Sequence, residues 1–162
     1  MSSTVTSIAL MTLLAPQLLG GSAVAVPGFD SAYAGESAFL TVGPGMSGQF
    51  QVFFMNTGTA TWRKGTASQI NLVVCAADKI TCNVDSPQAS WNDGSWLSSR
   101  AYSTHIQTEV APGRLGTFVY SFKVPLDVIS GNYRFNGDLA QATTGLRIHP
   151  EGYYQDATCS CP

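Results

Sequence analysis

The sequence predicts an all-β protein in which two antiparallel sheets pack face to face. From residue 37 onward, apolar side chains recur at every second position, which is the period of a strand with one buried face. Turn signals rich in glycine, asparagine and proline separate these stretches, at residues 43–45, 56–58, 92–94, 112–113 and 130–132. Because the stretches are short and none has a helical period, we expect a sandwich of about seven to nine strands.

Three segments carry the alternation most clearly, namely residues 48–56, 115–124 and 133–139. The side chains predicted to face the core are Phe50, Val52, Phe54, Phe118, Tyr120, Phe122, Val124, Tyr133, Phe135 and Leu139. Further strands are expected over residues 37–42, 69–75, 80–84, 103–108 and 145–149.

Within the sandwich class, an immunoglobulin-like arrangement is the leading prediction and a jelly roll is the alternative. Tyr133 stands at the start of a late strand, where immunoglobulin domains often place a tyrosine whose hydroxyl binds back to the preceding corner. Two residues later, antibody domains have a cysteine, whereas this chain has Phe135 and offers Val52 on the facing strand. We therefore expect packing to replace the disulfide between the sheets.

Several short motifs follow one another in a fixed order between residues 38 and 149. They are NTGTATW at residues 56–62, VAPG at 110–113, Phe118, Pro125 and GNY at 131–133. This order resembles the immunoglobulin-like "four-tryptophan" domain family of selective-autophagy receptors and bacterial cell-surface and secreted proteins. The chain departs from the family in having three tryptophans and in carrying ATTG at residues 142–145, where the family has a glycine and an aromatic. The resemblance implies a non-catalytic module for protein or surface contacts.

The N-terminal segment, residues 1–29, contains no charged side chain. Residues 23–25, with the sequence Ala-Val-Ala, suit a signal-peptide cleavage site, but the positive residues of a secretory signal are missing. Residues 5–26 are long enough to cross a hydrocarbon layer of about 30 Å as a helix. We expect the segment to be retained as a membrane anchor or a contact arm, with a cleaved signal as the alternative. The side chains expected to contact a membrane or a partner are Ile8, Leu10, Leu13, Leu14, Leu18 and Leu19.

The four cysteines form an even set, which suits disulfides in an oxidising compartment. Cys75 and Cys82 flank a predicted hairpin turn, so a disulfide between them is the first expectation. Cys159 and Cys161 are separated by one residue, and an unstrained disulfide between them is difficult. Pairing with another chain, a strained disulfide and reduced thiols all stay open for these two. A four-thiolate zinc site is the minor alternative, because the spacing lacks the usual C-x2–4-C pairs.

Charge and motifs argue against several functions. The net charge is −2 and has no basic cluster, so nucleic acid is not an expected partner. The two histidines, His105 and His149, have no carboxylate or cysteine beside them in the sequence, and no hydrolase or phosphate-binding motif is found. Asp85 with Asn92 and Asp93 could hold calcium, but a plain turn is favoured. We predict no enzyme activity, no cofactor and no metal site.

Residues 90–102 form the most distinctive candidate surface. Trp91, Trp96, Arg100 and Tyr102 combine the aromatic and arginine side chains that often anchor protein contacts. The alternative is that one of the tryptophans plugs an end of the sandwich.

The predicted organisation is an apolar segment over residues 1–29, a linker over 30–36, the sandwich over 37–150 and a C-terminal tail over 151–162. The leading functional hypothesis is a non-catalytic accessory subunit on the periplasmic or cell-surface side. It would be tethered to a membrane or a membrane protein complex by the N-terminal segment and would contact other protein subunits. The alternatives are a self-assembling filament or coat subunit, and a secreted ligand- or carbohydrate-binding module with a cleaved signal.

Overall fold

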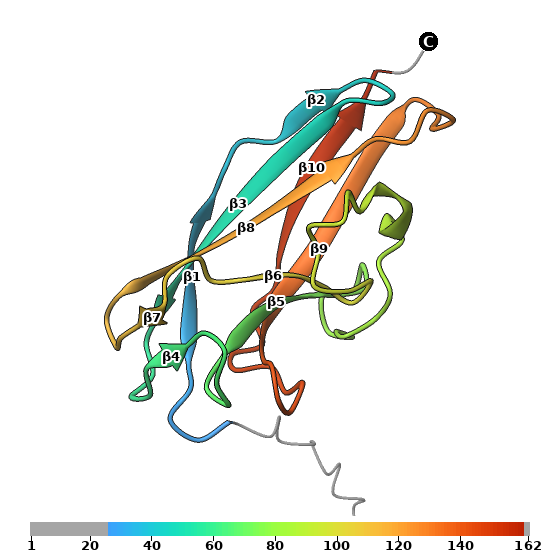
Figure 1. Cartoon of the computed structure of the whole chain (residues 1–162). Helices are drawn as coiled ribbons and strands as arrows, with labels where there is room; N and C mark the ends of the chain where they lie inside the picture. The colour runs from blue at the N-terminus through green and yellow to red at the C-terminus, as the bar shows by residue number, and fades with distance from the viewer. Residues whose placement is uncertain (1–25, 161–162) are drawn as a thin grey trace, which may run out of the picture.

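The computed structural model describes residues 26–160, which form a β-sandwich with one short 3-10 helix, η1 (Ala89–Trp91) (Figure 1). The strands are β1 (Ser31–Glu36), β2 (Leu40–Val42), β3 (Ser47–Asn56), β4 (Trp62–Arg63), β5 (Ile70–Val74), β6 (Ala101–Thr104), β7 (Glu109–Val110), β8 (Leu115–Lys123), β9 (Gly131–Gln141) and β10 (Tyr153–Cys159). The predicted all-β class is confirmed.

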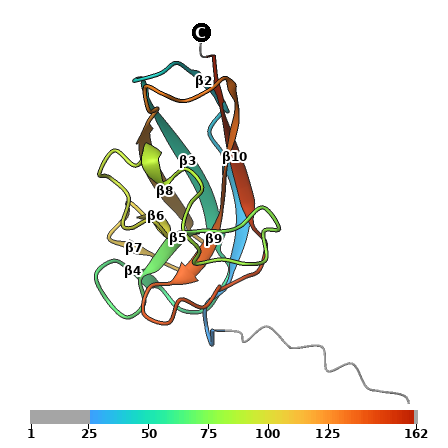
Figure 2. The ribbon, with the colours of Figure 1, turned by 90° about the vertical axis from the view of Figure 1, so that its right-hand side faces the viewer.

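Two sheets make the layers of the sandwich. One has the order β1-β3-β8 and the other the order β2-β10-β9-β5-β6, while β4 and β7 form a small separate ribbon. Neighbouring strands run antiparallel except β2 and β10, which are parallel. The long strands β3, β9 and β10 run along the length of the molecule (Figure 2).

The core consists mainly of aromatic side chains from β3, β8 and β9. The alternation predicted for β3 and β8 is confirmed, because Phe50, Phe54, Phe118 and Phe122 are fully buried. Phe135 of β9 lies between the sheets, with its ring centroid 5.6 Å from that of Phe50 and 5.3 Å from that of Phe122. Aromatic packing therefore joins the two sheets at this point, and each buried ring contributes about 1.5–3 kcal/mol.

Tyr133 closes the corner before β9 as predicted. Its hydroxyl donates to the carbonyl oxygen of Ile129 over 2.8 Å. Its ring is half-buried and lies against Trp91, with the ring centroids 4.6 Å apart. This residue therefore connects the loop before β9 to a segment that is distant in sequence.

The boundaries predicted for the sandwich are too narrow. Residues 30–36, predicted as a linker, contain β1, and residues 151–162, predicted as a tail, contain β10 in the interior of the five-stranded sheet. The alternation in β10 is masked because a core position holds Gln155, which is fully buried. Its amide donates to Ser37 Oγ over 3.1 Å, and its side-chain oxygen accepts from the hydroxyl of Tyr120 over 3.4 Å. A polar side chain is stable there because hydrogen bonds replace those to water.

Two predicted strands, residues 80–84 and 145–149, form only single bridges. Cys82 bridges to Cys75, and Arg147 bridges to Ala140. Asn83 has a φ of 58°, which interrupts an extended strand. The first strand prediction, residues 37–42, was also too long, because β2 spans three residues.

The predicted membrane or partner contacts, Ile8, Leu10, Leu13, Leu14, Leu18 and Leu19, lie outside the described residues. Within residues 26–160, no helix has the length and apolar character needed to cross a membrane.

Candidate functional site

The predicted contact surface at residues 90–102 is mostly part of the core. β5 pairs with β9 at residues 137–141, which leaves the first half of β9 without a neighbour on that edge. Trp91 fills this space and is 3% exposed, with its ring centroid 5.7 Å from that of Phe122 and 5.8 Å from that of Phe135. The segment between β5 and β6 therefore replaces a missing length of strand.

Trp96 and Tyr102 are buried as well. Trp96 is 6% exposed, and its indole nitrogen donates to the carbonyl oxygen of Ser121 over 2.6 Å. Tyr102 is fully buried, with its ring centroid 4.9 Å from that of Trp96. The prediction that these aromatic residues form an exposed surface is wrong, and the alternative in which tryptophan closes the sandwich describes them better.

Arg100 is the one member of that predicted surface that is exposed. Its Nε lies 3.2 Å from Asp85 Oδ1, and both side chains are more than half exposed. Hydrogen bonds from Arg100 and then from Ser99 lower the pKa of Asp85. Asp85 is therefore engaged in a surface ion pair.

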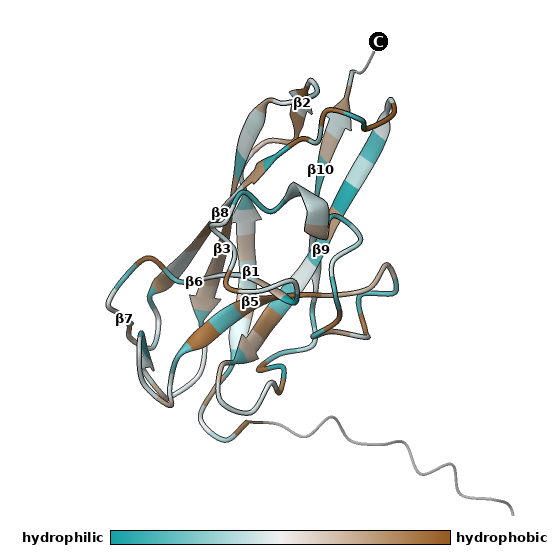
Figure 3. Cartoon of the chain, turned by 45° about the vertical axis from the view of Figure 1, so that its right-hand side comes forward, coloured by the Kyte–Doolittle hydropathy of each residue, from teal (hydrophilic) through white to brown (hydrophobic). Residues whose placement is uncertain are grey.

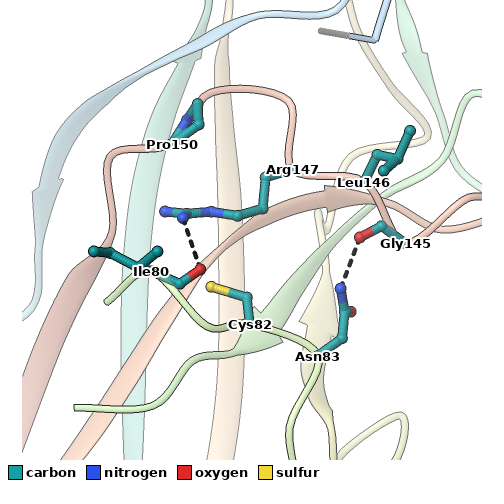
Figure 4. A pocket seen from close by; sticks show the side chains of 7 residues that line it. All are labelled: Ile80, Cys82, Asn83, Gly145, Leu146, Arg147 and Pro150. Carbon is teal, nitrogen blue, oxygen red and sulfur yellow. Dashed lines mark hydrogen bonds between the residues drawn. The ribbon is translucent and has the colours of Figure 1, made fainter. Parts of the chain in front are cut away.

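The predicted disulfide between Cys75 and Cys82 is confirmed. Cys159 is buried at the end of β10, and Cys161 lies outside the described residues. Cys82 lines a surface groove of about 390 Å³, together with Ile80, Asn83, Gly145, Leu146, Arg147 and Pro150 (Figure 4).

Hydrogen bonds hold the walls of this groove together. Arg147 donates from Nη1 to the carbonyl oxygen of Ile80 over 3.2 Å, and the amide of Asn83 donates to the carbonyl oxygen of Gly145 over 2.7 Å (Figure 4). The two loops that form the groove, residues 76–83 and 142–150, are therefore fixed to each other.

Arg147 also neutralises a buried carboxylate. Asp138 is fully buried and accepts hydrogen bonds from Arg147 Nε over 2.6 Å and from the backbone nitrogen of Glu151 over 3.3 Å. Burial raises the pKa of Asp138, while the ion pair with Arg147 acts in the opposite direction. The guanidinium is thus already paired, so the groove does not offer a free cation to an anionic ligand.

The histidines are occupied by structural contacts. His105 is fully buried, its Nδ1 lies 2.8 Å from the carbonyl oxygen of Gln107, and burial lowers its pKa. His149 Nδ1 lies 2.8 Å from Asp30 Oδ1 and so joins the loop before β10 to the start of β1. No group of three or more His, Cys, Asp or Glu side chains in residues 26–160 could hold a metal ion.

One end of the sandwich carries three exposed apolar side chains that the sequence reasoning missed. Met46 is 57% exposed, Leu126 is 82% exposed and Ile129 is 78% exposed. Met46 lies in the turn before β3, and the other two lie in the loop that joins β8 to β9. The turn and the loop are in contact, because the backbone nitrogen of Val124 donates to the carbonyl oxygen of Met46 over 2.8 Å. We call Met46, Leu126 and Ile129 the apolar tip.

Figure 3 shows hydrophobic residues in the loop between β8 and β9, at the end of the molecule where the C-terminus lies. Beside the apolar tip is a groove of about 360 Å³, which we call the tip groove. It is lined by Gly45, Ser90, Asn92, Asp93, Lys123, Val124, Pro125 and Leu126. The ionisable residues in its lining are Asp93 and Lys123, whose formal charges cancel.

A local signal for the apolar tip is present in the sequence. Residues 124–130, VPLDVIS, contain four aliphatic side chains although Pro125 and Asp127 mark a loop. Val124 is buried and Val128 packs against the core, which leaves Leu126 and Ile129 for solvent.

No family model and no curated protein matches the chain. Among solved structures, it is similar to a CARDB domain from Pyrococcus furiosus, with 13% identity, a TM-score of 0.44, and coverage of 84% of this chain and 97% of that one. It is also similar to AvmM, which catalyses macrocyclization in alchivemycin A biosynthesis, with 11% identity, a TM-score of 0.39, and coverage of 83% and 90%. A third structure, a family 123 glycoside hydrolase from Clostridium perfringens, has 8% identity and a TM-score of 0.37 over 80% of this chain and 27% of that one. At these values, the similarities carry no argument about function.

Proposed function

We propose that the chain is a non-catalytic extracytoplasmic subunit with an immunoglobulin-like fold that connects other molecules through its two ends. The strand order supports the fold assignment, because β10-β9-β5-β6 corresponds to the order G-F-C-C′ of a variable-type domain and β1-β3-β8 corresponds to A-B-E. The hydrogen bond from Tyr133 to Ile129 corresponds to the tyrosine corner of that fold. The motif order that resembles the four-tryptophan family points to the same class of contact module.

The observation that carries this proposal is the position of the two apolar regions. The charge-free residues 1–29 lead into the described chain at one end of the sandwich, and the apolar tip lies at the other end (Figure 1). Exposed apolar clusters and long uncharged segments commonly mark contacts with other proteins or with lipid. A domain with one such region at each end is suited to connecting two partners.

Contacts in the body of the domain support a non-catalytic role. The buried acid Asp138 is neutralised by Arg147, and His105 is enclosed by aromatic rings and bound to a carbonyl oxygen. These groups stabilise the sandwich and do not converge on a shared cavity.

The expected location is outside the cytoplasm, at a membrane or a membrane protein complex. The Cys75–Cys82 disulfide supports an oxidising compartment. The length and apolar character of residues 5–26 support a tether that is retained in the mature protein.

Cell fractionation combined with the intact mass of the native protein tests this function. We expect the full-length mass, lowered by about two daltons for each disulfide, in a membrane fraction or in a large assembly. A mature N-terminus near Val26 would instead support a secreted module with a cleaved signal. A full-length chain that is monomeric and freely soluble would overturn the connecting role.

A further inference from the structure

We propose that the tip groove of one copy receives the N-terminal segment of a second copy, so that the chains join head to tail. This inference rests on the proposed connecting function and names the partner at both ends as another copy of the same chain.

The chemistry of the two surfaces is complementary. Residues 1–29 carry no charge and contain leucine and isoleucine side chains that require an apolar environment. Leu126 lines the tip groove. The ionisable residues in its lining are Asp93 and Lys123, whose formal charges cancel. An uncharged apolar occupant would cover Leu126 and would bring no further charge to the groove.

The base of the segment is fixed to the end of the sandwich opposite the tip. The carbonyl oxygen of Gly28 accepts hydrogen bonds from the backbone nitrogens of Thr59 and Ala60 over 2.9 Å and 2.8 Å. The contact between Asp30 and His149 holds the next residues of the chain. The segment therefore starts at a defined point, far from the tip of its own copy (Figure 1).

This geometry permits binding between copies. To reach its own tip groove, the segment would have to turn back along the whole sandwich, whereas the tip of a neighbour can be placed directly beside its starting point. Twenty-five residues span at most about 85 Å when extended, so length does not limit the contact. One donor end and one acceptor end on each copy make a heterologous interface, which extends into a chain unless a rotation closes it.

The first experiment compares Leu126→Asp with Ile80→Asp in the full-length protein. Ile80 is a matched control, because it is an aliphatic side chain that is 75% exposed and lies away from the tip groove. Sedimentation velocity over a concentration series measures assembly, and circular dichroism confirms that both variants are folded. We expect Leu126→Asp to raise the concentration of half-assembly by about tenfold or more, and Ile80→Asp to change it less than about twofold. Equal assembly of both variants and the wild type would overturn the inference.

The second experiment identifies the occupant directly. Full-length chains with a photo-crosslinking residue at position 13 are made with nitrogen-14 and with nitrogen-15, mixed, and irradiated after assembly. We expect mass spectrometry to find mixed-isotope crosslinks from position 13 to the loop at residues 124–130.

Three other outcomes separate this inference from the proposed function. Same-isotope crosslinks to residues 124–130 without any mixed-isotope crosslink would show that the segment binds its own copy, and adducts with lipid would show that it enters a membrane. Both results overturn the head-to-tail contact, and the lipid adduct leaves the connecting function in place. A chain that neither assembles nor associates with membranes would contradict both proposals.

Discussion

Two loops beside the start of β9 place their apolar side chains in opposite ways. The long segment between β5 and β6 buries Trp91 and Trp96, whereas the short loop between β8 and β9 exposes Leu126 and Ile129. Tyr133 contacts both loops, through its ring to Trp91 and through its hydroxyl to Ile129. The difference shows that side-chain type does not decide which loop exposes its apolar residues.

The space that the strand arrangement leaves open explains the difference. The first half of β9 has no neighbouring strand on the side of β5, so the long segment can place large rings against the core. The loop at residues 124–130 crosses from one sheet to the other at the end of the sandwich, where Val124 and Val128 already occupy the inward positions. Its remaining aliphatic side chains have no core surface left to cover.

The strongest test of this comparison is Trp91→Ala. We expect it to lower the free energy of unfolding by about 3–5 kcal/mol, because it removes a buried ring and leaves a cavity. Leu97→Ala is the matched control in the same segment, since Leu97 is about half exposed and should change stability by less than about 0.5 kcal/mol. Urea unfolding measures both. A loss of stability in Trp91→Ala as small as that in Leu97→Ala would show that the segment does not belong to the core.

Removing the disulfide with Cys75→Ala and Cys82→Ala together should have the next largest effect. The disulfide fixes the place where the long segment leaves β5, and it closes a loop with a sequence separation of seven. Loss of this constraint on the unfolded chain should lower stability by about 2 kcal/mol. Urea unfolding under oxidising conditions measures the change. A difference below about 0.5 kcal/mol would mean that packing alone places the segment.

Tyr133→Phe should have a smaller effect. The variant keeps the ring against Trp91 and removes the hydrogen bond to Ile129, so we expect a loss of about 1 kcal/mol in thermal or urea unfolding. Unchanged stability would show that the ring contact alone connects the two loops.

Leu126→Asn should have the smallest effect on the stability of the monomer. Because the side chain is largely exposed, we expect a change within about 0.5 kcal/mol. Urea unfolding at a concentration too low for assembly measures it. A loss above about 1.5 kcal/mol would show that the loop at residues 124–130 supports the core after all.

The sequence predicted the strands in which apolar side chains are buried and polar side chains are exposed. Phe50, Phe54, Phe118 and Phe122 are therefore in the core as expected. β10 was missed because Gln155 occupies a core position through hydrogen bonds with distant residues, which alternation does not reveal.

The candidate surfaces were harder to predict because exposure depends on tertiary contacts. Trp91 is a core residue since β5 is too short to cover the length of β9, and Tyr102 of β6 is buried against Tyr120 of the opposite sheet. Leu126 and Ile129 are exposed since nearer valines take the inward positions. The disulfide between Cys75 and Cys82 was predictable because it depends on a local turn.

The parallel pairing of β2 with β10 determines when the domain can fold. It joins residues 40–42 to residues 157–159, so β2 lacks this partner until residues 157–159 have been synthesised. One edge of β9 also pairs with β10, and Ser37 accepts a hydrogen bond from Gln155 of β10. Both contacts therefore form only after β10 has been synthesised. Such long-range pairing delays closure of the sandwich until β10 has left the ribosome. A chain truncated before residue 153 would thus be released with an open sheet edge, exposed to aggregation and proteolysis.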